Sequence, residues 1–373
     1  MRPSSPSCFA LRPQTQSTFL LAKLFASRFR PEPADPHAFD TRPPPREPGP
    51  VGVLLVNLGT PDEPTPGAIR RYLAEFLSDR RVIEIPQWLW QIVLRGVVLP
   101  RRPAALAPRY REIWMPEGSP LLVWSLAQAR SLQQVFDTEG LPVRVEAAMR
   151  YGSPAVASAI DSLRGQGCER ILTVPMYPQY AAGTTATAVD AVAAVAGALR
   201  NQPELRFVKR FYADAGYIGA LAARVWAHWD AHGKPEKLLL SFHGLPRRVV
   251  ELGDPYYRDC MATAELLRQA LGADGALVEL AFQSRFGRAK WLEPYTEPTL
   301  KSWAAAGVRR VDVMCPGFLA DCLETLEEIQ GQCRASFLAA GGQEFRYIPC
   351  LNDDPAWIDA LAALVRRQLG GWL

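Results

Sequence analysis

Four short apolar runs, widely separated along the chain, constrain its fold more than any other feature. None of them alternates polar and apolar residues, and each contains Gly or Pro near its end. They are VGVLLVNLG (51–59), RILTVPMYPQY (170–180), KLLLSFHGLP (237–246) and RVDVMCPGFL (310–319). Strands that lack alternation are buried on both faces, as in a parallel sheet covered by helices. We therefore predict that the four runs are strands of parallel sheets.

Helical stretches separate these runs. Residues 65–79 begin with Thr followed by Pro, and residues 214–233 begin with Asp and end at Gly, which are start and stop signals of helices. The Ala-rich residues 184–200 suit a packed helix. The alternation of strands and helices predicts an α/β protein with a doubly wound sheet, arranged as two similar halves.

The composition argues against several classes of protein. The 373 residues carry a net charge of +4, and the arginines are spread along the chain without a basic block, so a nucleic-acid partner is not expected. The seven cysteines are odd in number and widely spaced, and no CxxC occurs. We therefore expect no disulfide framework and a reducing compartment such as the cytoplasm.

Two segments have unusual composition. Residues 1–50 are rich in Pro, and we expect a disordered extension there; a transit peptide is the alternative, because the first 31 residues carry Arg and Lys but no acid. Residues 85–100, IPQWLWQIVLRGVVLP, are too short for a membrane span and contain Pro and Arg. This segment favours a hydrophobic lip that contacts a membrane surface or a large flat ligand.

His243 is one of four histidines, and it follows the buried run LLLSF. Ligands of open parallel sheets bind outside the carboxyl ends of the strands. A histidine at such an end is partly desolvated, so its neutral form can serve as a base or as a metal ligand. A core histidine hydrogen-bonded to the main chain is the alternative, and the local sequence does not decide between them.

An acidic stretch follows the last apolar run. In GFLADCLETLEEI (317–329), Asp321, Glu324 and Glu328 have the spacing of one helical face, and no Lys interrupts residues 311–333. Neighbouring carboxylates raise one another's proton affinity, and such a row can pass protons or hand a divalent cation inward. The alternative is a solvated acidic face.

Other motifs are weaker. Gln283 and Trp291 lie in FQSRFGRAKWLEPYTEP (282–298), where they could bind a polar group and stack on a flat ligand, or pack as part of a loop. His228 and His232 are four residues apart, but Trp229 stands where a zinc-binding HExxH has Glu, so we interpret the pair as a helix end. The sequence contains no GxGxxG, GxxxxGK[ST] or GxSxG, the signatures of dinucleotide-binding, P-loop and hydrolase sites.

Seven blocks together carry a family resemblance. In order they are LLVNLGTP (54–61), RYREIWMPEGSPL (109–121), AMRYGSP (148–154), PMYPQYAAGTT (175–185), LLSFHGLP (239–246), FQSRFGRAKWLEPYT (282–296) and CPGFLADCLETLEEI (315–329). This set resembles the ferrochelatases, which insert Fe²⁺ into protoporphyrin IX to form haem b and release two protons. The resemblance covers roughly residues 51–365. The residues of 282–296 and 315–329 are most similar to those of proteobacterial members, which favours protoporphyrin over coproporphyrin as the substrate.

The resemblance implies two Rossmann-like, doubly wound domains with a porphyrin cleft between them. His243 matches the active-site histidine, and Glu324 matches the carboxylate across the macrocycle; both are expected to be catalytic and to contact the metal. Asp321 and Glu328 match an acidic path for metal or protons. The residues expected to bind porphyrin are Leu58, Arg150, Tyr151, Gln283 and Trp291, with residues 85–100 as a lip and Arg101 and Arg102 near the propionates.

The resemblance also suggests domain boundaries. We expect an N-terminal domain at residues 51–210 that includes the lip, and a C-terminal domain at residues 211–350 that carries His243 and Glu324. Residues 351–373 are expected to form a helix that packs back on the body.

Two positions depart from the family pattern. Ala182 stands where cluster-bearing relatives have Cys, and their C-terminal extension is not seen, so we expect iron as a substrate and no iron–sulfur cluster. Cys322 stands where several relatives have His, which weakens the case for a second histidine in metal delivery. The alternatives are a chelatase for another metal or tetrapyrrole, and a haem or metal carrier that would need no acidic row facing a histidine.

Overall fold

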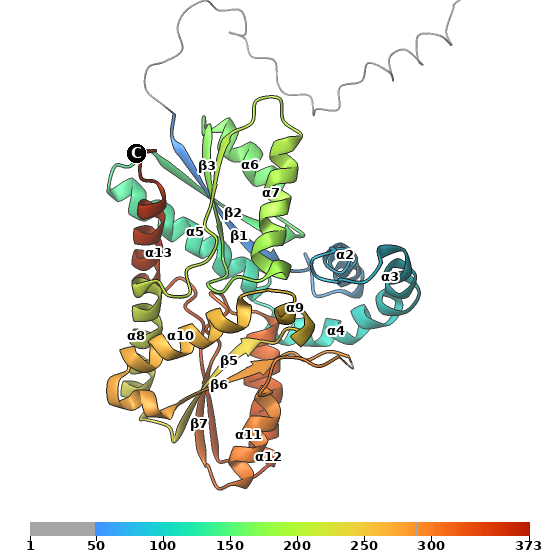
Figure 1. Ribbon diagram of the computed structural model, residues 1–373, viewed down its shortest axis with the longest axis vertical. Helices are drawn as coiled ribbons and strands as arrows, with labels where there is room; N and C mark the ends of the chain where they lie inside the picture. The colour runs from blue at the N-terminus through green and yellow to red at the C-terminus, as the bar shows by residue number, and fades with distance from the viewer. Residues whose placement is uncertain (1–48, 288) are drawn as a thin grey trace, which may run out of the picture.

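The computed structural model describes residues 49–287 and 289–373 (Figure 1). The extension predicted at residues 1–50 lies outside the described residues except for Gly49 and Pro50. The rest of the chain forms two four-stranded sheets flanked by helices. The predicted α/β class is confirmed.

The first sheet has the strand order β2-β1-β3-β4, and every neighbouring pair is parallel. Its strands are β1 (Val51–Gly59), β2 (Val143–Tyr151), β3 (Arg170–Pro175) and β4 (Glu204–Phe207). The helical segments of this half are α2 (Pro66–Phe76), α3 (Gln87–Val93), η1 (Leu94–Val98), α4 (Leu99–Ile113), α5 (Pro120–Thr138), α6 (Val156–Gly165), η2 (Ala182–Ala186) and α7 (Thr187–Gly197).

The second sheet repeats this topology with the order β6-β5-β7-β8, again with parallel pairs throughout. Its strands are β5 (Lys237–His243), β6 (Val278–Gln283), β7 (Arg310–Met314) and β8 (Glu344–Ile348). The remaining helical segments are α8 (Ala215–His232), α9 (Arg247–Glu251), α10 (Tyr256–Ala270), η3 (Gly272–Leu277), α11 (Thr296–Ala305), η4 (Glu324–Cys333), α12 (Arg334–Ala339) and α13 (Pro355–Gln368). The prediction of two similar halves is confirmed.

Helix ends follow the predicted capping signals. The Thr65 hydroxyl accepts a hydrogen bond from the Ala68 amide at the start of α2. The Asp214 carboxylate accepts from the amides of Gly216 and Tyr217 at the start of α8, and Gly233 ends that helix with a φ of 76°. These caps satisfy amides that a helix start leaves without partners.

The two halves share one hydrophobic core. The largest cluster of buried side chains runs from Val51 and Phe136 in the first half to Leu240 and Trp357 in the second. Helix α13 packs against both α8 and α5, so the last helix of the chain contacts each half (Figure 1). Helices α2, α3 and α4 form an arm that projects from the junction of the halves, at the right of Figure 1.

Candidate active site

His243 is the last residue of β5, and its ring is half-buried. Its Nδ1 lies 2.7 Å from the main-chain oxygen of Gly244. A carbonyl oxygen only accepts, so Nδ1 carries the proton of the neutral ring and Nε2 keeps its lone pair. Gly244 is required for this turn, because a Cβ there would lie 2.7 Å from the Gln283 oxygen and 3.2 Å from the Trp291 ring. The turn therefore presents His243 with Nε2 as a base.

Gln283 joins His243 to the acidic helix. It is the register partner of His243 at the end of β6 and is buried. Its Oε1 accepts a 2.7 Å hydrogen bond from the Ser241 hydroxyl, and its Nε2 donates to the main-chain oxygen of Glu324 at 2.9 Å. Both ends of the amide are thus used within the protein, and the side chain fixes Glu324 relative to the strand ends.

Ser284 holds the second carboxylate of the site. The residue has a φ of 64°, and in this conformation its amide and hydroxyl donate to the two oxygens of Glu328 at 2.7 and 2.5 Å. Burial raises the pKa of Glu328, the Ser284 hydrogen bonds and the charge of His243 oppose the rise, and Glu324 adds to it. The charges of His243 and Glu324 therefore both act on the Glu328 carboxylate, which Ser284 holds in place next to Gln283.

The acidic helix differs from the predicted one. It is a π-helix over Glu324–Cys333, a helix type defined by amides that bond five residues back, and Asp321 lies before it. The prediction that Asp321, Glu324 and Glu328 share one α-helical face is therefore wrong. Asp321 does not share a helical face with the two glutamates, because its hydrogen bonds hold it in the segment before the π-helix.

The Asp321 carboxylate is buried and fully partnered. It accepts hydrogen bonds from the Thr325 hydroxyl at 3.0 Å, the Tyr347 hydroxyl at 2.6 Å and the Asn352 amide at 2.8 Å. Such a carboxylate braces the start of the π-helix and the loop after β8. Its assignment to a metal or proton path stays a prediction.

The first half supplies an opposite wall from α2 and α4. Burial and then the neighbouring charges, Glu324 among them, raise the pKa of Tyr72 and of Tyr110. Arg102, also on α4, lies with its guanidinium 4.8 Å from the centre of the Phe286 ring. Helix α4 also contacts the π-helix, where Arg109 lies 3.6 Å from Glu327, so the arm meets the acidic helix across the junction of the two halves.

Arg150 and Tyr151, at the end of β2, are organised by Asp79. The Asp79 carboxylate accepts from the Arg150 guanidinium at 2.7 Å, from the Tyr151 hydroxyl at 2.9 Å and from the Thr187 hydroxyl. Burial opposes ionisation, but hydrogen bonds from Thr187, Arg81 and Tyr151 and the charge of Arg150 lower the pKa of Asp79. Sequence reasoning missed Asp79, which lies outside a regular element.

Leu58 and Trp291 occupy different surroundings. Leu58 is partly buried at the end of β1, where it packs against clusters that also contain Leu323 and Phe318 of the second half. Trp291 packs on the turn after His243, and its Nε1 donates to the Phe286 oxygen at 2.8 Å. The structure thus brings His243, Gln283, Glu324 and Glu328 together, with Leu58 beside the helix start.

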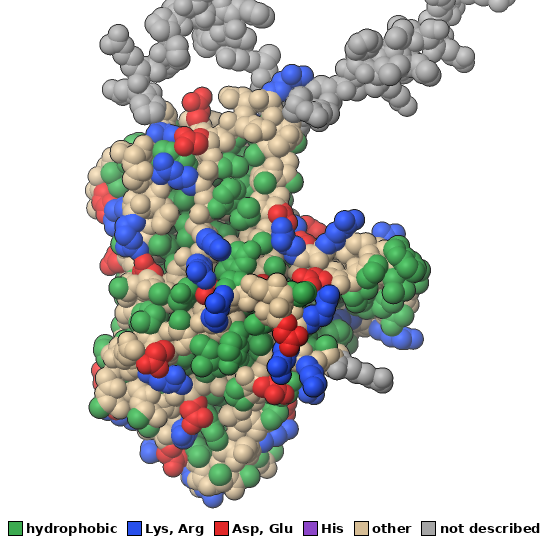
Figure 2. All heavy atoms as spheres, in the orientation of Figure 1, with side chains coloured by type: hydrophobic (Ala, Val, Ile, Leu, Met, Phe, Trp, Pro, Cys, Tyr) green, Lys and Arg blue, Asp and Glu red, His purple; other side chains and the backbone are tan. Residues whose placement is uncertain are grey.

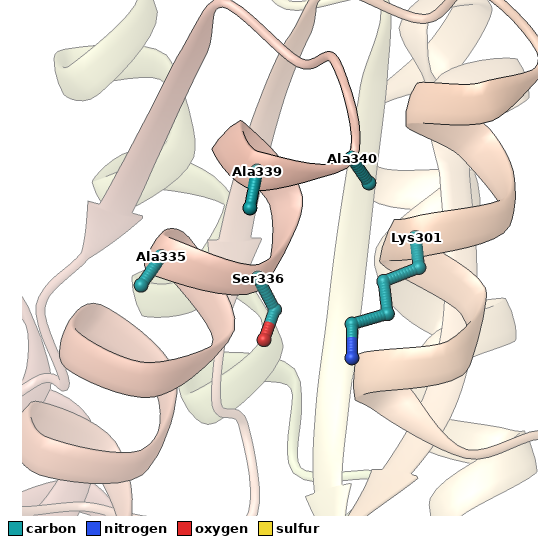
Figure 3. A pocket seen from close by; sticks show the side chains of 5 residues that line it. All are labelled: Lys301, Ala335, Ser336, Ala339 and Ala340. Carbon is teal, nitrogen blue, oxygen red and sulfur yellow. The ribbon is translucent and has the colours of Figure 1, made fainter.

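Metal ligands are not pre-assembled. Within residues 49–287 and 289–373, no group of three or more His, Cys, Asp or Glu side chains is placed to hold a metal ion. A surface depression between α11 and the end of α12, shown in Figure 3, is lined by Lys301, Ala335, Ser336, Ala339 and Ala340, and none of the predicted site residues lines it. It offers neither metal ligands nor a nucleophile.

Comparison with known proteins decides the family. The ferrochelatase family model matches residues 50–369. The chain belongs to the ferrochelatase family. The ferrochelatase of Bordetella pertussis is 62% identical over 95% of this chain and 98% of its own length, and that of an Azoarcus species is 59% identical over 87% and 89%.

The fold agrees with this assignment. SirB from Bacillus subtilis, solved with Fe³⁺, covers 85% of this chain and 94% of its own at 14% identity, with a TM-score of 0.50. At this identity the likeness concerns the fold alone. As a ferrochelatase, the chain is an enzyme of haem synthesis, a metal chelatase of the lyase class that acts on a porphyrin and iron.

Proposed function

We propose that the enzyme inserts Fe²⁺ into protoporphyrin IX, with His243 as the proton acceptor and Glu324 as the group that meets the metal. The observation that carries this proposal is the His243 ring, whose Nδ1 is held by the Gly244 oxygen so that Nε2 is free to accept a proton. Glu324 and Glu328 supply carboxylates beside it.

The chemistry requires two proton acceptors or one acceptor used twice. One Fe²⁺ enters the macrocycle and two pyrrole protons leave, so the protein must remove positive charge as the metal arrives. Neutral imidazole accepts the first proton at Nε2. Glu328, whose pKa is raised by burial, is suited to pass protons onward, and Glu324 can bind Fe²⁺ or relay the second proton.

The macrocycle is proposed to lie between the arm and the second half. Support comes from Tyr72, Tyr110 and Arg102 of the arm, since the charge of Glu324 acts on the pKa of each of them. Leu58, Arg150, Tyr151, Gln283 and Trp291 remain proposed porphyrin contacts. The polar ends of Arg150, Tyr151 and Gln283 are hydrogen-bonded within the protein, and Tyr151 and Gln283 are buried, so the half-buried Leu58, Arg150 and Trp291 are the more accessible of the five. Iron is the substrate, and we propose that no iron–sulfur cluster takes part.

Substrate choice can be tested directly. Anaerobic assays with Fe²⁺ and either protoporphyrin IX or coproporphyrin III would follow the loss of porphyrin fluorescence. We expect the larger kcat/KM for protoporphyrin. Turnover of coproporphyrin alone would contradict the proposed substrate while leaving the family assignment intact.

We further propose that α3 brings the enzyme to a membrane surface from the cytoplasm. Trp88 and Ile92, one turn apart, are 72% and 66% exposed, whereas Trp90 donates to the Leu77 oxygen and Leu94 is buried against α2. Figure 2 shows hydrophobic side chains gathered at this tip of the arm. No helix among the described residues is long and apolar enough to cross a bilayer.

Vesicle sedimentation tests the membrane contact. Trp88→Glu and Ile92→Glu should lower the fraction of protein that pellets with phospholipid vesicles, since they place charge on the inserted face. Leu252→Glu, an exposed apolar residue outside the arm, serves as the control. Equal sedimentation of all variants would contradict the contact.

A further inference from the structure

Gln128 reaches from the first half of the molecule into the second. It lies in α5, and its side chain is fully buried. Its Nε2 donates to the main-chain oxygens of Leu319 at 2.8 Å and of Asn352 at 2.6 Å. Leu319 follows β7 and Asn352 follows β8, so one amide holds two loops at the carboxyl ends of the second sheet. Its Oε1 has no hydrogen-bond partner among the described residues, so only its donors are used.

The two loops lead directly to Glu324. Asn352 has a φ of 49°, and its amide donates to the Leu319 oxygen at 2.9 Å. The Asn352 side chain accepts from the Asp321 amide at 2.9 Å and donates to the Asp321 carboxylate at 2.8 Å. Asp321 in turn accepts from Thr325, the neighbour of Glu324. A continuous set of buried hydrogen bonds thus runs from Gln128 to the start of the π-helix.

The same helix is tied to the first sheet. One turn before Gln128, the Ser125 hydroxyl accepts a 3.1 Å hydrogen bond from the Asn57 side chain. The Asn57 oxygen accepts from the Leu58 amide at 2.9 Å. Helix α5 therefore connects the end of β1, where Leu58 lies, with the loops that lead to Glu324.

We propose that Gln128 is a positioning residue for iron insertion, which sets the place of Glu324 relative to the first half through Asn352 and Asp321. The inference rests on the role proposed for Glu324. Displacement of a reacting group by about 1 Å can cost on the order of 100-fold in rate. Because Gln128 acts on Glu324 only through Asn352, Asp321 and Thr325, we expect a loss of about tenfold in kcat or a comparable rise in KM for Fe²⁺.

The test compares two glutamines of α5. Gln128→Met keeps the length of the side chain and removes the donors to the second half. Gln133→Met removes similar donors, since Gln133 bonds the Val143 oxygen at 3.0 Å, but these stay within the first half. Kinetics for Fe²⁺ and protoporphyrin, porphyrin affinity by fluorescence and the midpoint of thermal unfolding are measured for both variants.

Gln128→Met should impair kcat or KM for Fe²⁺ while its porphyrin affinity stays within about twofold of wild type, and Gln133→Met should keep wild-type kinetics. Wild-type kinetics of folded Gln128→Met would overturn the inference. Equal rate losses in both variants, in proportion to lost folded protein and with unchanged KM, would also overturn it.

Two further variants keep the test decisive. Asn352→Gly retains the left-handed backbone and removes the side-chain bonds to Asp321, so it should show the loss expected of Gln128→Met. It therefore tests the inference even if Gln128→Met does not fold. Wild-type kinetics of Asn352→Gly would overturn the inference. Glu324→Gln separates the two proposals. If Glu324→Gln is impaired and the positioning variants are not, only the inference fails; if Glu324→Gln is fully active, the proposed role of Glu324 fails with it.

Discussion

The side-chain amide of Gln283 donates a 2.9 Å hydrogen bond to the main-chain oxygen of Glu324. Gln283 is also the register partner of His243, so this single bond couples the strand end that carries the base to the first turn of the acidic helix. Ser284 extends the coupling to Glu328. The spacing between imidazole and carboxylates is therefore set by two adjacent residues of β6 and the loop that follows.

Glu328 should make the protein less stable as pH rises. Burial raises its pKa, so the folded protein binds a proton that the unfolded chain releases from about pH 4.5 upward, and the free energy of unfolding falls through the raised pKa. Glu328→Gln should remove this fall and slow iron insertion by about tenfold. Urea unfolding of wild type and of Glu328→Gln from pH 4 to 8 measures the free energy of unfolding. Parallel stability curves would contradict the role assigned to burial.

Asp79→Asn should weaken porphyrin binding and destabilise the fold by about 3 kcal/mol, because it leaves the partly buried Arg150 without its counter-charge. The pKa of Asp79 is lowered, so its contribution is present above pH 4 and lost as pH falls through the folded value. Fluorescence titration and urea unfolding check both effects. Asp190→Asn, which removes an exposed pair with Arg81, should change neither by more than a small amount.

His228 should limit stability in acid. Burial, His232 and Arg346 lower its pKa to about 4, and Arg346 already occupies the Asp312 carboxylate at 2.6 Å. As pH falls from 6.5 to 4 the unfolded chain takes up the proton first, which costs at most about 3 kcal/mol of stability. His228→Gln should reduce this loss fully, and the exposed His232→Gln should reduce it only in part, because burial is the larger cause of the lowered His228 pKa. Unfolding midpoints at pH 7 and 4.5 decide; equal losses in wild type and His228→Gln would contradict the prediction.

The sequence predicted the central strands and missed the edge strands for one physical reason. β1, β3, β5 and β7 each have a neighbour on both sides and are buried nearly throughout, so their apolar runs are unbroken. The edge strands β2, β6 and β8 carry partly exposed residues between buried ones, and the edge strand β4 has no buried residue, so none of them shows an unbroken apolar run. Their existence follows from the pairing of strands rather than from local pattern.

Site residues at the ends of strands could be predicted from the sequence. Site residues that are placed by hydrogen bonds to distant parts of the chain could not. His243 and Gln283 lie at strand ends, and ends of parallel strands converge. The π-helix at Glu324 was not predictable, because spacing in sequence does not reveal bonding to the fifth residue. Asp79 and Gln128 gave no signal, since each acts on residues more than 70 positions away.

The central claim is that His243 accepts protons during iron insertion, and one comparison tests it most directly. Wild type, His243→Ala and His232→Ala are each mixed anaerobically with protoporphyrin and Fe²⁺, and porphyrin binding and fluorescence loss are followed. The account predicts that His243→Ala binds porphyrin but inserts iron at least about 100-fold more slowly, while His232→Ala matches wild type. Insertion by His243→Ala at the wild-type rate would contradict it.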